Sequence, residues 1–544
     1  MIVDTYAKQK ITVSVYLKRD THDNGMTLKE YADAVIAGTH PILTHDEFYD
    51  QFSVTNQNEN IVKAWATNNN LIIENFHPGA ALMQITGTAE QFNQLFSIKL
   101  RTIIDTATQT AVRTHNGGIV IPNEIINSVD HIIGLDNSVK LKHNAVSVNS
   151  NIAPNASSVP LTPAQVAKAY NLPSSDGYGA CIAIVELGGG FTTQNLNSSF
   201  TRIGINTNPN IFAISVDGTT NTPEYSSSIE VMLDIYVIGG AAPKANIPVY
   251  FAPNSFQGFF DVFSAAVNDT VNMPTVISCS WGTDELYFSG YTILFDAVFQ
   301  QAIALGISIF NATGDYGSEA VSGDSAYSVQ YPASSPYAIS VGGTTLQLNL
   351  DNSIANEYAW NQGNASSAGG VSTVYSRPSW QTGLTSRKYI SGAAQTPVAL
   401  TGRGIPDVAG NADPSTGYVF YYGPDNSITQ NGGTSAAAPF WAAMVGIINA
   451  VSGKRLGFLG IGKLYSSSSI FNDITVGNNA APNSSGYITT TGWDAVTGLG
   501  SPIGSAIYGL LRTGEVFPKN NFGFRNITSS RLTYPRRNAG TRTD

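Results

Sequence analysis

The chain has 544 residues, of which 42% are hydrophobic, and its formal net charge at pH 7 is −10. This length exceeds that of one ordinary domain, and the apolar content excludes a disordered chain. Residues 151–512 hold 11 Lys and Arg against 21 Asp and Glu, so we expect no nucleic-acid partner, because this block offers no basic surface for phosphates.

The charged residues are also few. They make up 12% of the chain, which is about half the usual share. Sparse titratable groups limit the self-repulsion that protonation causes, and this suits a protein that works in acid. An ordinary acidic protein is the more common explanation of the same composition.

The N-terminal part, residues 1–143, mixes two kinds of pattern. Thr88 and Gln91 form a capping box at the start of a helix. Further strand-like and helical runs lie at 11–17, 58–69 and 81–86. We therefore predict a small α+β domain. The first residues alternate like a strand and contain no apolar stretch of the kind that a signal peptide needs.

Two segments have the composition of connecting chain. Residues 144–160 carry no charge and are rich in Asn, Ser, Ala and Pro, which is typical of an exposed linker and of a place where a protease cuts. Residues 513–544 hold six basic and two acidic residues with little periodicity. We interpret them as a solvated tail.

Residues 161–512 alternate between apolar strands and helices. The clearest strands are expected at 180–187, 211–216, 246–252, 275–282 and 307–314, and the clearest helices at 228–240, 259–267 and 293–306. This order predicts an α/β domain with a parallel sheet and helices on both faces. Functional sites in such sheets form at the carboxyl ends of the strands.

Other features of this block argue against metal, disulfide or membrane roles. Cys181 and Cys279 lie in apolar runs without metal-ligand or disulfide spacing, so we expect buried free thiols. We find no apolar run that approaches the roughly 20 residues of a membrane span, and we expect no membrane partner.

Ser435 is the candidate nucleophile. It lies in GGTSAAAP, directly before an apolar helix that contains Pro439 in its first turn. A helix N-terminus favours negative charge, and small residues after the serine allow a close backbone approach. A lone serine here is usually a plain helix cap, but the complete motif is rarer and resembles the nucleophile segment of subtilisin-like folds.

A nucleophilic serine needs a base, usually a histidine. All seven histidines lie at or before residue 143, so a base in the later block must be a carboxylate or a lysine. Glu230 and Asp234 are four residues apart on an apolar helix and share one face. We expect a half-buried pair in which like charges disfavour double ionisation. A solvated acidic face is the alternative.

A third carboxyl group, that of Asp315, follows an apolar strand and stands in the sequence TGDYG. This places it at the carboxyl end of a strand. By itself, the segment is more often a plain turn.

Taken together, these segments resemble the sedolisin family of serine-carboxyl peptidases, and most closely its kumamolisin-like members. The similarity rests on SIEVMLDIYVIGGAAPKANIPVYFAP, ATGDYGS, GRGIPDVAGNADPSTGY and GGTSAAAP, in that order. It is dense from residue 161 to about 510 and weaker across residues 1–143. It implies a subtilisin-like fold preceded by an activation domain, with a triad of Ser435, Glu230 and Asp234 and with Asp315 at the oxyanion.

These roles imply an acidic optimum. A carboxyl group donates a hydrogen bond to a developing oxyanion only while it keeps its proton, so an ionised Asp315 would repel the oxyanion at neutral pH. In strong acid, a protonated Glu230 could not accept the serine proton.

Two further segments of the resemblance suggest neighbours of Glu230. They are VELGGG, which contains Glu186, and SCSWG, which contains Trp281, each at the end of an expected strand. We treat both residues as candidate supporting partners of Glu230. Structural packing is an equal alternative.

Near the C-terminus, FNDITVGNN and TTGWDAVTGLGSPIG resemble the calcium site of the family. The resemblance implies one structural Ca²⁺ held by carboxylate and backbone oxygens, namely those of Asp473, Ile474, Thr490, Gly492 and Asp494. Family members often have Gly at Thr490, which matters only if the backbone there needs a positive φ. Two Asp-rich turns are the alternative.

We therefore expect the zymogen of an acid-acting endopeptidase with protein or peptide substrates. Residues 1–143 would be its intramolecular inhibitor and residues 161–512 its catalytic domain. The resemblance implies an extracellular enzyme, and we expect a monomer. A non-catalytic binding protein of the same fold is an alternative, against which the four intact residues count. The missing histidine counts against a serine–histidine hydrolase of the subtilisin type.

Overall fold

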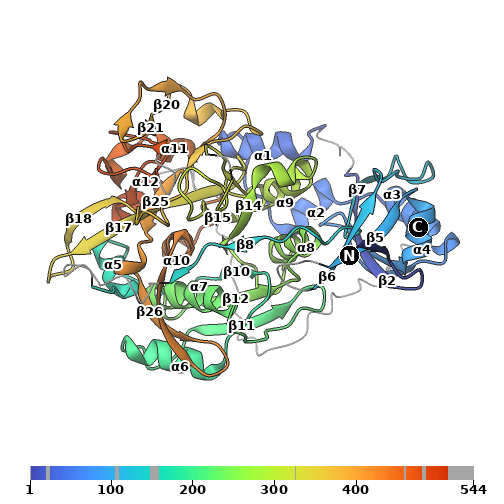
Figure 1. The fold of residues 1–544 in the computed structure, drawn as a ribbon, viewed down its shortest axis with the longest axis horizontal. Coiled ribbons are helices and arrows are strands. Elements are labelled where there is room, and N and C mark those ends of the chain that lie inside the picture. The colour runs from blue at the N-terminus through green and yellow to red at the C-terminus, as the bar shows by residue number, and fades with distance from the viewer. Residues whose placement is uncertain are drawn as a thin grey trace, which may run out of the picture.

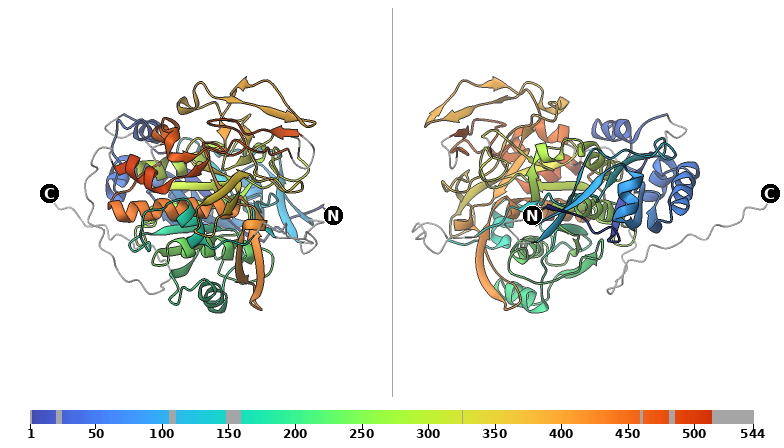
Figure 2. Two further views of the ribbon diagram at one scale, coloured as in Figure 1. Left: turned by 90° about the vertical axis from the view of Figure 1, so that its left-hand side faces the viewer. Right: turned by 45° about the vertical axis from the view of Figure 1, so that its right-hand side comes forward.

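The structure is a computed structural model that describes residues 2–19, 25–104, 110–147, 159–324, 326–458, 461–480 and 485–512. A smaller N-terminal domain, drawn in blue, lies beside a larger α/β domain, drawn from green to red (Figures 1 and 2). This arrangement confirms the predicted fold class. The expected tail of residues 513–544 and most of the expected linker lie outside the described residues.

In its described residues, the N-terminal domain contains two antiparallel sheets and four helices. The larger sheet has the strand order β3-β4-β2-β7, and the smaller has the order β1-β5-β6. The strands are β1 (Ile2–Asp4), β2 (Lys10–Leu17), β3 (Ile72–His77), β4 (Leu82–Thr88), β5 (Lys99–Ile104), β6 (Ala111–Asn116) and β7 (Val129–Ile133), and the helices are α1 (Leu28–Ile36), α2 (His45–Phe52), α3 (Asn56–Asn68) and α4 (Ala89–Leu95). The predicted capping box of Thr88 and Gln91 begins α4.

The larger domain is built on one sheet with the strand order β11-β12-β10-β13-β15-β17-β18, and β25 pairs with β17. The strands are β10 (Ile182–Glu186), β11 (Asn210–Ser215), β12 (Asn246–Phe251), β13 (Val276–Cys279), β15 (Ser308–Ala312), β17 (Ile339–Leu348), β18 (Ile354–Ala359) and β25 (Val408–Asn411). All pairs are parallel except β17–β18. The predicted parallel sheet is thus confirmed, with one antiparallel strand, β18, at its edge. The short β17–β18 connection reverses the chain direction.

Helices pack on both faces of this sheet, as predicted. On one face, α7 (Ser228–Ala241) contacts α10 (Thr434–Ser452), and on the other α8 (Phe256–Val267) contacts α9 (Thr292–Ala304) (Figure 1). The N-terminal domain joins the second face, where α1 contacts α9. Shorter elements are α5 (Pro163–Ala169), α6 (Thr193–Arg202), α11 (Ile461–Tyr465), α12 (Gly504–Arg512), β8 (Lys142–His143), β9 (Val146–Ser147), β14 (Trp281–Asp284), β16 (Gln330–Tyr331), β19 (Gly370–Val371), β20 (Thr385–Ser386), β21 (Lys388–Ile390), β22 (Ala393–Ala394), β23 (Val398–Ala399), β24 (Gly404–Ile405), β26 (Tyr418–Tyr422), β27 (Ser427–Gly432), β28 (Phe471–Asn472), β29 (Ser485–Tyr487) and β30 (Ser501–Pro502).

The central helix α10 corrects one expectation. Within the described ranges, it is the one helix that is long and apolar enough to cross a membrane, whereas we found no such run in the sequence. Almost all of α10 is buried in the protein. Its apolar composition therefore reflects its place in the core. Both cysteines are free and buried, as expected.

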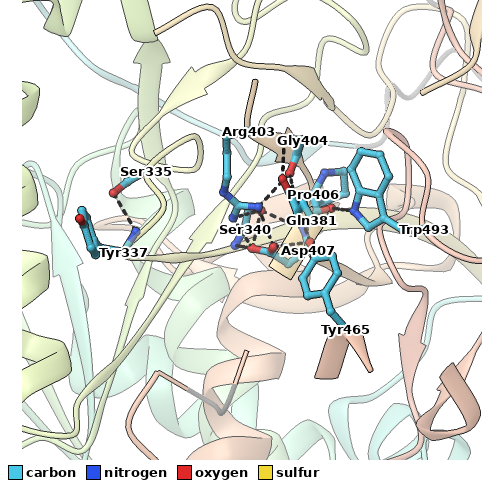
Figure 3. A network of polar contacts seen from close by, with 10 residues as sticks. All are labelled: Ser335, Tyr337, Ser340, Gln381, Arg403, Gly404, Pro406, Asp407, Tyr465 and Trp493. Carbon is cyan, nitrogen blue, oxygen red and sulfur yellow. Dashed lines mark hydrogen bonds and ion pairs between the residues drawn. The ribbon is translucent and has the colours of Figure 1, made fainter. Parts of the chain in front are cut away.

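A buried ion pair connects the sheet to the C-terminal segments. The Arg403 guanidinium donates to both carboxylate oxygens of Asp407, at 2.8 and 2.5 Å, and both side chains are fully buried (Figure 3). The Ser340 hydroxyl on β17 donates to Asp407 Oδ2 at 2.9 Å, and the Tyr465 hydroxyl at the end of α11 donates to Oδ1 at 2.6 Å. Trp493 donates its indole N–H to the Pro406 carbonyl oxygen in the same loop.

This ion pair generates a stability prediction. The substitution Arg403→Leu leaves the Asp407 carboxylate buried without a cation, and we expect the free energy of unfolding to fall by about 3–5 kcal/mol in urea titration. Arg377 is exposed, so Arg377→Leu should change it by less than about 0.5 kcal/mol. A loss below about 1 kcal/mol for Arg403→Leu would show that the pair does not support the fold.

Candidate active site

Ser435 lies at the second position of α10, where β27 enters the helix through Gly433. Gly433 has a φ of 96°, which favours glycine. A Cβ atom there would also lie 2.1 Å from the Asn144 carbonyl oxygen and 2.5 Å from Asp315 Oδ2. Only glycine therefore fits at this turn. The N–H of Ser435 belongs to the first helical turn and has no i−4 partner inside the helix, so it is placed to receive an anionic oxygen.

Glu230 and Asp234 lie one turn apart on α7, and both are fully buried. We expected a half-buried pair, but α10 and β26 cover this helix. The Ser280 hydroxyl, directly after β13, lies 3.0 Å from each Asp234 carboxylate oxygen and donates to them. Burial, and then the negative charge of Glu230 and Glu186, raises the pKa of Asp234 well above its ordinary value.

Glu186 and Trp281 stand at the carboxyl ends of neighbouring strands, as expected. The Trp281 indole Nε1 donates to Glu186 Oε2 at 2.9 Å. Burial, and then the charge of Glu230, raises the pKa of Glu186 well above its ordinary value. The three carboxyl groups of Glu186, Glu230 and Asp234 thus interact electrostatically in one buried cluster.

Asp315 follows β15 and faces the N-terminus of α10. Its Oδ1 accepts hydrogen bonds from the N–H and the hydroxyl of Thr434, each at 2.8 Å. Its Oδ2 is buried and forms no hydrogen bond within the described part of the chain. Burial raises the pKa of Asp315 to about 8, although the Thr434 hydrogen bonds oppose this shift. In acid, the Asp315 carboxyl group therefore keeps a proton that it can donate.

Several polar atoms of this site are buried and lack a hydrogen-bond partner among the described residues. They are Ser435 Oγ, both carboxylate oxygens of Glu230 and Asp315 Oδ2. A buried polar atom left unpaired costs about 1–3 kcal/mol, so their presence in one site indicates that they are kept for a reacting group. A hydroxyl, carboxyl groups and a helix N-terminus together are suited to acyl transfer.

The chain itself crosses this site. β8 pairs antiparallel with β14 (Figure 1). β9 pairs antiparallel with β27, and residues 144–145 connect β8 to β9. We expected residues 144–160 to be an exposed linker, but Asn144 is buried. The reason is that this segment adds a strand to two sheet edges, in the way that an extended peptide ligand does.

His143 enters the site with this segment. Its Nδ1 lies 3.2 Å from Glu230 Oε2, at ion-pair distance but without the alignment of a hydrogen bond. Burial lowers the pKa of His143, but the contact with Glu230 and then the charge of Asp315 more than offset this, so that its pKa is raised. All seven histidines precede the predicted catalytic domain in the sequence, so we expected none at the active site. This one reaches the site, but it contacts Glu230, while Ser435 Oγ has no hydrogen-bond partner among the described residues.

The sequence analysis also missed Asn144, Ser280 and Gln330, which lie at the same site. The change in composition after residue 143 was a signal for Asn144, because we interpreted it as a place for a cut. Ser280 lies in the SCSWG segment that we singled out for Trp281. Nothing in the sequence marks Gln330.

The expected calcium segments come together away from this site. The Gly492 N–H donates to Asp473 Oδ2 and the Thr490 N–H to Asp494 Oδ2, each at 3.0 Å. Asp494 is buried, and burial raises its pKa to about 7. Thr490 is not among the residues with positive φ, so the difference from glycine does not strain its backbone. Within the described residues, no group of three or more His, Cys, Asp or Glu side chains is arranged to hold a metal ion. A calcium site of two carboxylates and several carbonyls does not require such a group.

Comparisons with protein families agree with the two-domain organisation. Residues 4–138 match the family described as "Pro-kumamolisin, activation domain", and residues 204–455 match the subtilase family. The chain is 36% identical to kumamolisin from Bacillus sp. (strain MN-32), over 91% of this chain and 90% of that protein. It is 27% identical to sedolisin from Pseudomonas sp. (strain 101), over 90% of this chain and 85% of that protein.

A solved structure shows the same fold. Pseudomonas sedolisin, described as a serine-carboxyl proteinase in complex with two molecules of pseudo-iodotyrostatin, superposes with a TM-score of 0.57 at 27% identity. The match covers 65% of this chain and 99% of that one.

Proposed function

This chain belongs to the sedolisin family of serine-carboxyl peptidases, and from that premise we propose that it is the zymogen of an acid-acting endopeptidase with Ser435 as nucleophile and Glu230 as base. The observation that carries this proposal is the buried cluster in which Ser435 Oγ, both Glu230 oxygens and Asp315 Oδ2 lack partners among the described residues. As a member of this family, the protein is a hydrolase of peptide bonds.

The proposed mechanism uses side chains only. Glu230 accepts the hydroxyl proton as Ser435 Oγ attacks the peptide carbonyl carbon, and Asp234, fixed by Ser280, orients Glu230. The proton then passes to the leaving amine, and an acyl-enzyme ester remains. Water attacks this ester with Glu230 again as base, which releases the acid product and restores the serine.

Asp315 would stabilise the oxyanion in this mechanism. The negative oxygen forms beside the Ser435 N–H at the start of α10, and Asp315 Oδ2 is the buried oxygen on that side. A protonated carboxyl group is a strong donor in a site that excludes water. Its raised pKa, about 8, keeps it protonated through the acidic and neutral range.

We also propose that residues 1–143 inhibit the enzyme in the intact chain. Two observations support this: the activation-domain match, and the strand pairings that place residues 142–147 across the site. A substrate cannot pair with β14 and β27 while these residues occupy the edges. Cleavage within this connection would free the site.

A structural calcium ion is proposed at the Asp473 and Asp494 segments. The buried Asp494 carboxylate forms no ion pair with Lys or Arg within the described residues, and a nearby cation would offset the cost of its burial. The carboxylates of Asp473 and Asp494 and the carbonyls of Ile474, Thr490 and Gly492 would hold the ion, which would crosslink the two segments.

The role of the base gives the first activity prediction. Glu230→Gln keeps the shape of the side chain but cannot accept a proton, so kcat/KM on a peptide substrate at acidic pH should fall about 10²–10⁴-fold. Ser435→Ala should lose at least as much. An unchanged melting temperature would show that Glu230→Gln is folded. Near-parental kcat in that folded variant would mean that another carboxylate is the base.

The role of Asp315 gives a pH prediction. Parent activity should decline on the alkaline side as Asp315 loses its proton. The pKa of about 8 belongs to the intact chain, in which residues 142–147 help to bury Asp315, so release of this segment should move the alkaline limb to lower pH. Asp315→Asn donates a hydrogen bond at every pH, so it should keep part of the activity and lose this alkaline limb, while the acidic limb remains.

The pH dependence of the free energy of unfolding tests the protonation of Asp315 independently of activity. The pKa of this group is raised in the folded state, so between about pH 4 and about pH 8 the folded protein binds more protons than the unfolded chain, and stability falls as pH rises. Asp315→Asn should show a smaller fall. An identical alkaline limb and an identical stability profile in the variant would contradict the proposed protonation.

Calcium removal gives a further prediction. Chelation should lower the melting temperature of the full chain, because an ion that binds only the folded state stabilises it. Asp473→Asn should weaken calcium binding in calorimetry and reduce this difference. If chelation changes nothing and elemental analysis finds no calcium, the site is absent from this protein.

A further inference from the structure

The Asn144 side chain lies in a buried pocket opposite a single partner. Its Nδ2 donates to Gln330 Oε1 at 3.1 Å, and Gln330 Nε2 donates back to Asn144 Oδ1 at 3.3 Å. The exposed fractions are 2% for Asn144 and 1% for Gln330. Two primary amides thus form a reciprocal pair with water excluded, which is a specific form of recognition.

The protein holds the Gln330 amide in one orientation. Gln330 Nε2 also donates to the Ala320 carbonyl oxygen at 2.6 Å, so one N–H and the Oε1 remain for whatever enters the pocket. Gly282 and Gly314 leave the room for this amide. A Cβ atom at Gly282 would lie 2.6 Å from Gln330 Oε1, and one at Gly314 would lie 2.5 Å from Gln330 Nε2.

The backbone of Asn144 is positioned for reaction. Its N–H donates to the Ser280 carbonyl oxygen at 3.1 Å, and its own carbonyl oxygen lies at the Gly433 turn together with Asp315 Oδ2. Val146 pairs with Gly432 on the other side. The Asn144–Ala145 peptide bond therefore crosses the site beside the first turn of α10, which contains Ser435.

We propose that Gln330 makes this enzyme select an asparagine side chain on the acyl side of the bond that it cleaves, and that Asn144–Ala145 is the first such bond, in its own chain. This inference rests on the proposed function and specifies its substrate class: proteins that present an extended segment with a primary amide at this position.

The step balances without any co-reactant other than water. Ser435 Oγ bonds to the Asn144 carbonyl carbon, the bond from this carbon to the Ala145 nitrogen breaks, and the nitrogen leaves as an amine with the serine proton. Water then hydrolyses the ester and leaves a carboxyl group on Asn144. One peptide bond and one water molecule are consumed.

The pocket would reject other side chains of similar size. Leucine would leave Gln330 Oε1 and one N–H buried without partners, which is costly. An ionised aspartate could accept from Gln330 Nε2, but its second oxygen would face Gln330 Oε1, whereas a protonated aspartate could donate to Oε1. The pocket should therefore reject aspartate only where its carboxyl group is ionised. Sites built around buried hydrogen bonds discriminate strongly against ligands that lack the matching group.

The test uses peptides that span residues 139–149 of this chain, with Asn, Leu or Asp at position 144, and the acid-processed parent enzyme. We expect kcat/KM for the Asn peptide to exceed that for the Leu peptide by about 10–100-fold, with cleavage directly after Asn. Equal rates for Asn and Leu would overturn the proposal. Because this series uses the parent enzyme, it does not depend on the folding of a variant.

Gln330→Leu tests the residue itself. Within one preparation of this variant, the ratio of kcat/KM for the Asn peptide to that for the Leu peptide should fall to about 1 or below. A loss of folded enzyme cannot change this ratio, because it lowers both values equally. Gln347 is a matched control, since it lies on β17 and accepts from Asn356 Nδ2 at 3.2 Å. Gln347→Leu should keep the parental ratio. A parental ratio in Gln330→Leu would remove Gln330 as the selector.

Intact-mass analysis of the acidified full chain completes the test. The first N-terminal fragment should end at Asn144, and Asn144→Leu should slow its release by a factor similar to that in the peptide series. A first cut at another bond contradicts the inference. If the enzyme digests a denatured protein through Ser435 without preference for Asn, only this inference fails, and if it digests nothing in acid, the proposed function fails with it.

Discussion

The site depends on the burial of four carboxyl groups, and among the described residues the one basic side chain at ion-pair distance from any of them is His143, beside Glu230. Glu186, Glu230, Asp234 and Asp315 are all at most 2% exposed, and within the described residues no Lys or Arg forms an ion pair with any of them. Ionising all four would be very costly. Protons must therefore be retained on some of these groups, and in the proposed mechanism a retained proton turns Asp315 into a donor. A histidine base would not require such an arrangement.

The zymogen segment fits the same electrostatic constraint. Residues 142–147 cross the site and help to exclude water from Asp315. They also bring His143 to ion-pair distance from Glu230, so that the proposed base is already in contact with a basic group. Inhibition and substrate binding therefore use the same strand edges. The N-terminal domain holds this segment in place through its contacts with the helices on the second face of the sheet. The proposed calcium ion would stabilise the C-terminal segments of the larger domain.

The elements and the places of the candidate catalytic residues on them could be predicted, because both follow from local patterns. The roles of these residues were implied by the family resemblance and stay predictions. The alternation of strands and helices gave the α/β fold, and the spacing of Glu230 and Asp234 put them on one face of α7. The burial of these side chains, and the contacts between residues far apart in the sequence, could not be predicted from local patterns. The full burial of α7 depends on α10 and β26, and the contact between Asn144 and Gln330 joins residues 186 positions apart. His143 belongs to the N-terminal part by sequence, yet strand pairing with Trp281 carries it into the site.

The central claim is that Ser435 opens a peptide bond with a carboxyl group, that of Glu230, as its base. The most direct measurement is rapid acid quenching of the processed enzyme during turnover of a peptide ester, followed by peptide mapping in a mass spectrometer. The account predicts that the peptide containing GGTSAAAP gains the acyl mass at Ser435 within the first turnover. Turnover without any acylated peptide, or acylation of a different residue, would contradict it.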